Sequence, residues 1–209
     1  MILSNIRVYD FEESLIASGY AMRTEVGNKT TIDAKDLKRG KLLTKLSLTN
    51  GAHAQWLTGV RVNFDVTFTN KAWVEAERYR FFEFVTSQST MHRITKFDLG
   101  ASYNEYVDSR MVEIMREKIN TYNTLLAKED VDLSDEIKRL YLEILYSNPS
   151  GFKITARITT NYRCLLNMYL QRHDHRLPEW REFCKELLAL PYFKVLLEAY
   201  LNKEVTLDE

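Results

Sequence analysis

The segment from residue 60 to residue 69 constrains the fold more than any other, because its side chains alternate strictly between apolar and polar. Val60, Val62, Phe64, Val66 and Phe68 take every second position, and polar or charged residues stand between them. Successive side chains of a β-strand point to opposite faces, so the pattern predicts a strand with one buried and one polar face. The sequence therefore predicts a sheet that is covered on one face.

Most other segments have the apolar spacing or the capping signals of helices. Helices are predicted at 11–23, 35–48, 71–84, 104–127, 133–147 and 160–173 and from Pro178 and Pro191, and short strands at 2–9 and 152–158. Asn50-Gly51 is the expected end signal of the second helix, and Asp132 or Ser134 is the expected cap of the fifth. Asn148 to Gly151 should break the chain. With no internal repeat or linker, we expect one α+β domain over residues 1–209.

Composition indicates a globular protein without a strong overall electrostatic field. Of 209 residues, 45% are hydrophobic, and 29 Lys and Arg balance 29 Asp and Glu, so an anion site must be local and a nucleic-acid partner is disfavoured. Cys164 and Cys184 lie among apolar residues and are expected to be reduced core thiols. No stretch of eighteen uncharged apolar residues occurs, so we expect a cytoplasmic protein with no membrane partner.

Four polar side chains lie in the otherwise apolar segment 160–173: Asn161, Arg163, Asn167 and Arg172. At about 100° per residue, Arg163 and Asn167 share a face, whereas Asn161 and Arg172 point nearly the opposite way. Polar anchors on a core helix require partners. Those partners are either neighbouring backbone groups or ligands in pockets built between subunits.

This segment resembles the flavin-dependent thymidylate synthase family, whose pattern is Asn-x-Arg, Leu, Asn and then Arg-x-Asp ahead of a helix with a tryptophan. The matching residues are Asn161, Arg163, Leu165, Asn167, Arg172, Asp174 and Trp180. The resemblance implies that Asn161, Arg163 and Asn167 contact a flavin. It also implies that Arg172 contacts deoxyuridylate (dUMP) and is the residue to assign to catalysis.

Residues 62–93 resemble the strand, helix and signature loop of the same family. There the helix ends in Arg-His-Arg, followed by seven residues, a serine, and an arginine two positions later. Arg93 fits the last position, which puts Met91 at the serine and Phe81-Phe82-Glu83 at Arg-His-Arg. Arg78-Tyr79-Arg80 takes that place if the loop is three residues longer.

Site residues follow from this loop by resemblance. Arg78 and Arg80 are the expected flavin contacts, and Ser87, Ser89 and Arg93 are expected to bind the nucleotide substrate. Residues 144–146 hold no counterpart of a family arginine expected shortly before the strand at 152.

Three weaker signals remain. Asn50-Gly51-Ala52-His53 is similar to the family's Gly-His turn, which implies that His53 lies near the flavin, although a histidine in a turn can be plain surface. His173 and His175 lack a convincing third ligand, so no metal site is expected. The basic residues of segment 35–48 form either a solvated helix face or an electrostatic funnel for nucleotide or folate: Lys38, Arg39, Lys41 and Lys45.

The resemblance implies a fold with a small mixed or antiparallel sheet packed with several long helices, in a homotetramer with shared active sites. It implies reductive methylation of dUMP to dTMP, with FAD as cofactor and with NADPH and methylenetetrahydrofolate as co-substrates. Two alternatives stay open. One is a related pyrimidine-nucleotide-modifying enzyme such as a hydroxymethylase, and the other is a flavin-free nucleotide-binding or structural homologue without catalysis.

Overall fold

A computed structural model describes residues 1–47, 51–128 and 133–201. The chain forms two compact units, each made of several segments. The first comprises residues 1–66, 76–85 and from 157 onward, and the second comprises 67–75 and 86–156. Three strands run from one unit into the other, and a single domain stays a prediction.

Four strands form one antiparallel sheet in the order β1-β2-β4-β3, which confirms the α+β class. Their bounds are Leu3–Tyr9 for β1, Arg61–Thr69 for β2, Glu83–Ser87 for β3 and Lys153–Asn161 for β4. β1 pairs with β2 from Leu3 opposite Val66 to Tyr9 opposite Arg61, with an irregularity between Ser4 and Arg7.

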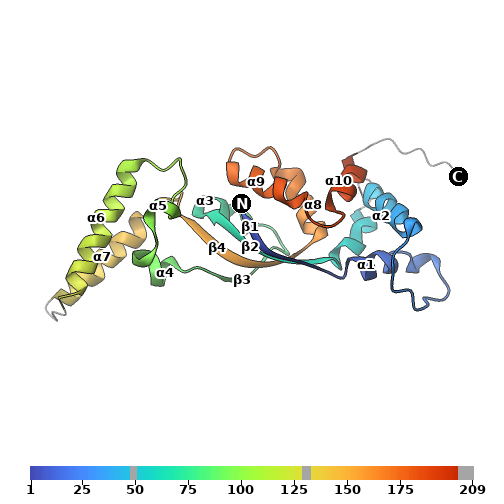
Figure 1. Cartoon of the computed structure of the whole chain (residues 1–209), viewed down its shortest axis with the longest axis horizontal. Coiled ribbons are helices and arrows are strands. Elements are labelled where there is room, and N and C mark those ends of the chain that lie inside the picture. The colour runs from blue at the N-terminus through green and yellow to red at the C-terminus, as the bar shows by residue number, and fades with distance from the viewer. Residues whose placement is uncertain (48–50, 129–132, 202–209) are drawn as a thin grey trace. The chain divides into compact units, whose positions relative to one another are not determined.

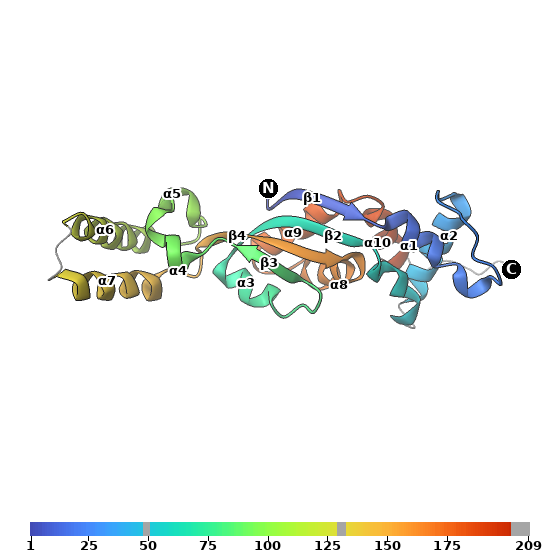
Figure 2. The same cartoon turned by 90° about the horizontal axis from the view of Figure 1, so that it is seen from below.

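The alternation of the 60–69 segment is confirmed, because its apolar side chains are all buried. In the first unit, α8 (Tyr162–Arg172), α9 (Pro178–Leu187) and α10 (Phe193–Leu201) cover one face of the strands (Figures 1 and 2). The ring of Phe64 in β2 packs edge-on against Phe183 of α9 at 6.0 Å between centroids. This contact ties the strand to the helical layer.

The first unit also contains α1 (Phe11–Ala17), η1 (Tyr20–Met22), α2 (Ala34–Leu46) and η2 (Gly51–Thr58). The predicted helix 11–23 is therefore too long, since it is interrupted at Ser18 and Gly19. The predicted helix 35–48 corresponds to α2. Its expected end signal at Asn50 lies outside the described residues.

A buried ion cluster holds α2 against the preceding chain. Asp36 is 1% exposed and forms ion pairs with Lys29 and Arg39. Arg39 also donates to Leu15 O at 2.8 Å and to Ser18 Oγ at 3.0 Å. Hydrogen bonds from Lys29 and then from Arg39 lower the pKa of the Asp36 carboxyl. The expectation that Arg39 belongs to a solvated face is therefore wrong, because it binds the carboxylate one turn earlier.

The second unit has its own core, built around Ile94, Met115, Ile144 and Phe152. Its elements are α3 (Asn70–Ala76), which starts in this unit, α4 (Thr90–Arg93), η3 (Ile94–Lys96), α5 (Leu99–Ser102), α6 (Ser109–Leu126) and α7 (Ser134–Ser147). The two long helices α6 and α7 lie side by side (Figure 1).

Two predicted helices differ from the structure because of backbone conformations that a helix cannot contain. The helix expected at 71–84 ends at Ala76, and Phe81 beyond it has a φ of 72°. The helix expected from Pro191 begins at Phe193, because Tyr192 has a φ of 58°. Positive φ belongs to the left-handed region, so neither residue can continue a right-handed helix.

One helix start and one predicted cap also differ from the structure. The helix expected from residue 104 begins at Ser109, where the Asp108 carboxylate accepts from Arg110 N at 2.9 Å as N-cap. The N-cap position of α7 is Leu133 and has no side-chain cap, so Ser134 is not the cap; Asp132 lies outside the described residues.

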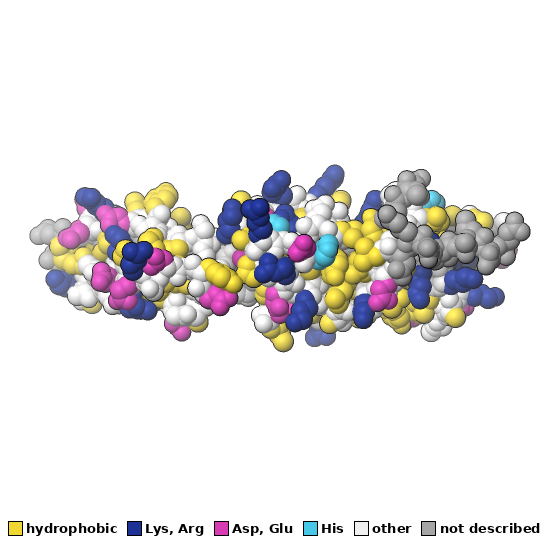
Figure 3. All heavy atoms as spheres, turned by 90° about the horizontal axis from the view of Figure 1, so that it is seen from above, with side chains coloured by type: hydrophobic (Ala, Val, Ile, Leu, Met, Phe, Trp, Pro, Cys, Tyr) yellow, Lys and Arg dark blue, Asp and Glu magenta, His cyan; other side chains and the backbone are white. Residues whose placement is uncertain are grey.

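Cys164 and Cys184 are free and buried, as expected. Within the described residues, no helix has both the length and the apolar character that crossing a membrane requires. Basic and acidic side chains are interspersed over the face seen in Figure 3, in keeping with the balanced charge.

Candidate functional site

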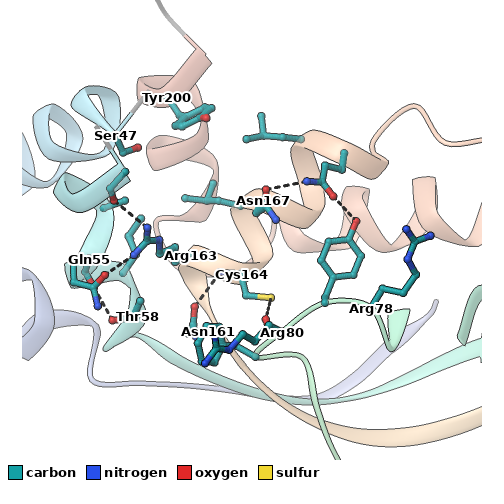
Figure 4. Close-up of a pocket in the computed structure, with 18 residues that line it drawn as sticks. Ser47, Gln55, Thr58, Arg78, Arg80, Asn161, Arg163, Cys164, Asn167 and Tyr200 are labelled. Atoms are coloured by element: carbon teal, nitrogen blue, oxygen red, sulfur yellow. Dashed lines mark hydrogen bonds between the residues drawn. The ribbon is translucent and has the colours of Figure 1, made fainter. Parts of the chain in front are cut away.

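A cavity of about 760 Å³ lies in the first unit. Its wall is built mainly from η2, from residues 78–81 after α3 and from α8 (Figure 4). Ser47 and Tyr200 complete the described lining. Sites for nucleotide-sized or drug-sized molecules typically have volumes of about 300–1,000 Å³, so the cavity is large enough for such a ligand.

The start of α8 forms one side of the cavity. Asn161 ends β4 in an extended conformation and caps the helix, since its Oδ1 accepts from Cys164 N at 2.9 Å. Asn161 lines the same cavity as Arg163, so the projection that put them on opposite faces is wrong. The reason is that the cap residue does not follow the 100° rotation of the helix.

Arg163, the second residue of α8, is held toward η2. Its guanidinium donates to Gln55 Oε1 and, at 3.1 Å, to Gly51 O (Figure 4). A planar guanidinium fixed in this way has a defined orientation, which suits recognition of an anionic group.

Amide groups continue the wall along α8. Gln171 Nε2 donates to Asn167 Oδ1 at 3.1 Å, and Tyr79 Oη donates to Gln171 Oε1 at 2.8 Å (Figure 4). The chain of hydrogen bonds joins α8 to the segment that carries Arg78 and Arg80. The side-chain amides of Asn167 and Gln171 are thereby held in fixed orientations and offer hydrogen-bond donors and acceptors along the cavity wall.

The cavity is cationic. Arg78, Arg80 and Arg163 line it, and the described lining contains no Asp or Glu. Arg78 and Arg80 are both exposed, and within the described ranges no hydrogen bond or ion pair engages either guanidinium. A dense local positive charge in a chain of net charge zero favours an anionic ligand.

Arg172 does not line this cavity but stands next to its wall. Its Nε donates to Tyr79 Oη at 2.7 Å, and its Nη1 lies 2.8 Å from His175 Nε2. Its guanidinium carbon lies 5.0 Å from the ring centroid of Trp180 and 5.5 Å from that of Tyr79. Arg172 therefore joins the end of α8 to α9 and to the Tyr79 turn.

Replacing Arg172 by alanine is expected to lower the free energy of unfolding by about 2 kcal/mol or more, because a charged hydrogen bond and two ring contacts are lost. Urea unfolding measures this change. Arg176→Ala, at an exposed position four residues on, is the control and should change the value by less than about 0.5 kcal/mol. Equal stability of the two variants would contradict the joining role.

The remaining expected site residues lie elsewhere. His53 lines a smaller hollow of about 480 Å³ beside Trp56, and this hollow shares Gln55 and Thr58 with the main cavity. The second unit carries the nucleotide-binding candidates Ser87, Ser89 and Arg93. Ser89 caps α4 there by accepting from His92 N at 3.3 Å.

Sequence reasoning missed several residues of the cavity, of which Gln55, Phe81, Cys164 and Gln171 are the most informative. No pattern marks Gln55 or Gln171, because glutamine is an ordinary residue on a helix surface. Burial raises the pKa of the Cys164 thiol, so it is not poised as a thiolate nucleophile.

The two histidines after α8 have protein partners. His175 Nδ1 accepts from Leu177 N at 3.2 Å, and the His173 ring stacks on Tyr169 at 5.5 Å. Across the described ranges, no three His, Cys, Asp or Glu side chains are grouped as a metal site would require.

The arrangement of the whole chain is similar to that of solved enzymes. The flavin-dependent thymidylate synthase ThyX from Helicobacter pylori, complexed with FAD and dUMP, matches with a TM-score of 0.68 and 16% identity, over 97% of this chain and 100% of that one. The chain has the ThyX fold. This confirms the fold that the resemblance implied.

A second ThyX structure from Helicobacter pylori, with FAD and dUMP, gives a TM-score of 0.65 at 16% identity and covers 96% of this chain and 98% of that chain. The ThyX fold is also shared with the UMP/dUMP methylase PolB from Streptomyces cacaoi, bound with 5-Br dUMP, at a TM-score of 0.59 and 12% identity. That match covers 95% of this chain and 94% of PolB. No protein-family model matches the sequence, and a search of curated proteins finds no match.

Proposed function

We propose that the chain is a flavin-dependent enzyme that methylates a pyrimidine nucleotide, converting dUMP to dTMP. One observation carries the proposal: a cavity of about 760 Å³ at the start of α8 is lined by three arginines and, in its described lining, by no carboxylate. A dinucleotide such as FAD has a negatively charged pyrophosphate, which this charge pattern suits.

The residues present fit such a cofactor. Arg78 and Arg80 offer guanidinium groups to the phosphates, and the first turn of α8 adds the positive end of a helix. Asn161 and Arg163 lie at that helix end. The amides of Asn167 and Gln171 can both donate and accept, as the polar edge of a flavin ring requires.

In the proposed reaction a methylene group from methylenetetrahydrofolate replaces the hydrogen at C5 of dUMP, which leaves as a proton, and a hydride then completes the methyl group as tetrahydrofolate is released. Bound in the cavity, reduced flavin supplies that hydride, and NADPH is the proposed source of its electrons. The chain's own part is to bind and orient. By the resemblance, Arg172 contacts the nucleotide, and His53 lies near the flavin.

Spectroscopy and an isotope assay test this function. The purified protein, supplied with FAD, is expected to bind it, and to release tritium from dUMP labelled at C5 when methylenetetrahydrofolate and NADPH are present. Formation of a hydroxymethylated product would instead support the alternative function, that of a hydroxymethylase. A protein that binds neither FAD nor dUMP would overturn the proposal in favour of the structural homologue.

We also propose a homotetramer with shared active sites. The support for it is the resemblance, because that family builds each pocket from several subunits; the partners of Arg172 described above lie in its own chain. Light scattering at micromolar concentration is expected to give four times the 24.6 kDa chain mass. A strictly monomeric protein would contradict shared sites.

A further inference from the structure

The turn that follows α3 holds an aromatic residue in a conformation that normally belongs to glycine. Phe82 N donates to Tyr79 O at 3.2 Å, which closes a four-residue turn with Arg80 and Phe81 in its centre. Phe81, at the third position, has a φ of 72°. Positive φ at this position is typical of glycine in a type II turn, and a bulky side chain there is strained.

Both flanks of the turn are anchored, which explains how the strained conformation is maintained. Tyr79 is held through its hydroxyl by Gln171 and Arg172. Phe82 is 3% exposed, and its ring packs against Phe64 and Phe183. The carbonyl oxygen of Arg80 lies 3.5 Å from the Cys164 sulfur. The fold thus specifies the backbone of Phe81 from both sides.

The Phe81 ring itself does not serve the core. It is 50% exposed and lines the cationic cavity, and the Arg80 guanidinium carbon lies 5.1 Å from its centroid. An exposed ring beside an arginine in a cavity is a surface on which a planar ring can stack, while the cation meets an attached phosphate. Burial in the core cannot explain why a phenylalanine occupies this position.

We propose that Phe81 is a positioning residue that stacks against the heteroaromatic ring of a nucleotide bound in the cavity. This inference rests on the proposed function and adds to it the residue that orients the ring. Either the isoalloxazine or the adenine of FAD has the required planar ring.

Three variants test the proposal by titration with FAD, FMN and ADP. Phe81→Leu keeps the apolar bulk without the aromatic ring and should weaken FAD binding about tenfold, whereas Phe81→Tyr should stay within about threefold of the unchanged protein. Phe81→Gly should also weaken binding about tenfold, yet leave Tm unchanged or raise it, because glycine relieves the strain. If Phe81 served only to stabilise the fold, Phe81→Gly would lower Tm.

The probes identify the ring. A loss confined to FAD and FMN assigns the stacking to isoalloxazine, and a loss confined to FAD and ADP assigns it to adenine. The control is Phe84→Leu, which removes a ring that is 41% exposed, three residues on and outside the cavity lining, and should leave all three affinities unchanged.

FAD binding by Phe81→Leu equal to that of the unchanged protein would overturn the stacking role and leave the proposed function standing. An equal loss in Phe84→Leu would overturn it as well. If the unchanged protein binds none of the three probes, the proposed function fails and this inference fails with it. If Phe81→Gly does not fold, the strain argument is wrong, and the Leu and Tyr variants still decide the stacking.

Discussion

Replacing Arg78 and Arg80 together by alanine is expected to weaken FAD binding at least a hundredfold. Hydrogen bonds to charged groups contribute about 1.5 kcal/mol or more each, so the loss of two corresponds to about 3 kcal/mol and two factors of ten. Both side chains are exposed in the cavity wall, so the fold should be unaffected. Isothermal titration measures the affinity, and circular dichroism verifies the fold.

The matched control removes two arginines from α6 in the second unit. Arg110 and Arg116 have 86% and 46% of their side chains exposed, and their removal changes the net charge by the same amount. Their double alanine variant should bind FAD like the unchanged protein. Equal weakening in both variants would mean that the protein's overall charge governs binding, which would remove Arg78 and Arg80 from the site.

Replacing Asp36 by asparagine is expected to lower the free energy of unfolding by about 2–3 kcal/mol, because a buried carboxylate loses its charged hydrogen bonds with Lys29 and Arg39, both of which keep some contact with water. The Asp36 side chain is only 2% exposed between Lys29 and Arg39. Loss of its charge also releases the contacts of Arg39 that join α2 to Leu15 and Ser18. Urea unfolding at pH 7 tests the value.

The same carboxyl predicts a pH dependence. Its pKa is lowered in the folded protein, first by the hydrogen bond from Lys29, so the folded state favours the ionised form. Its contribution to stability is complete above about pH 4, where the unfolded aspartate is ionised, and declines as the pH falls below that value. The unchanged protein should therefore lose more stability between pH 5 and pH 2 than Asp36→Asn does.

Asp108→Asn is the control for this substitution. Asp108 caps α6, and asparagine is an equally good N-cap, so only the exposed pair with Arg110 is lost. Its stability should change little. A large effect at Asp108 together with a small one at Asp36 would contradict the role assigned to the buried cluster.

Much of the fold was predictable because its signals are local. The alternation of Val62, Phe64 and Val66 predicted a half-buried strand, and Pro178 predicted the first turn of α9. The errors lie where a distant contact or a backbone conformation intervenes. The helix expected to reach residue 84 ends at Ala76 and could not pass Phe81, whose φ is positive. Arg39 leaves the solvated face because Asp36 binds it.

The sequence by itself determined the α+β class, the run of polar residues from Asn161 to Arg172, and the resemblance that led to the ThyX fold. Periodicity and spacing carry this information because each depends on residues close together in the chain. The resemblance had already implied that Arg78, Arg80 and Arg163 contact one flavin, but only the tertiary structure placed them in a single cavity and gave Arg172 its partners. Arg78 and Arg80 meet Arg163 there, while Arg172 is turned to Tyr79 and Trp180, because such meetings depend on long-range packing, which no local pattern of residues encodes.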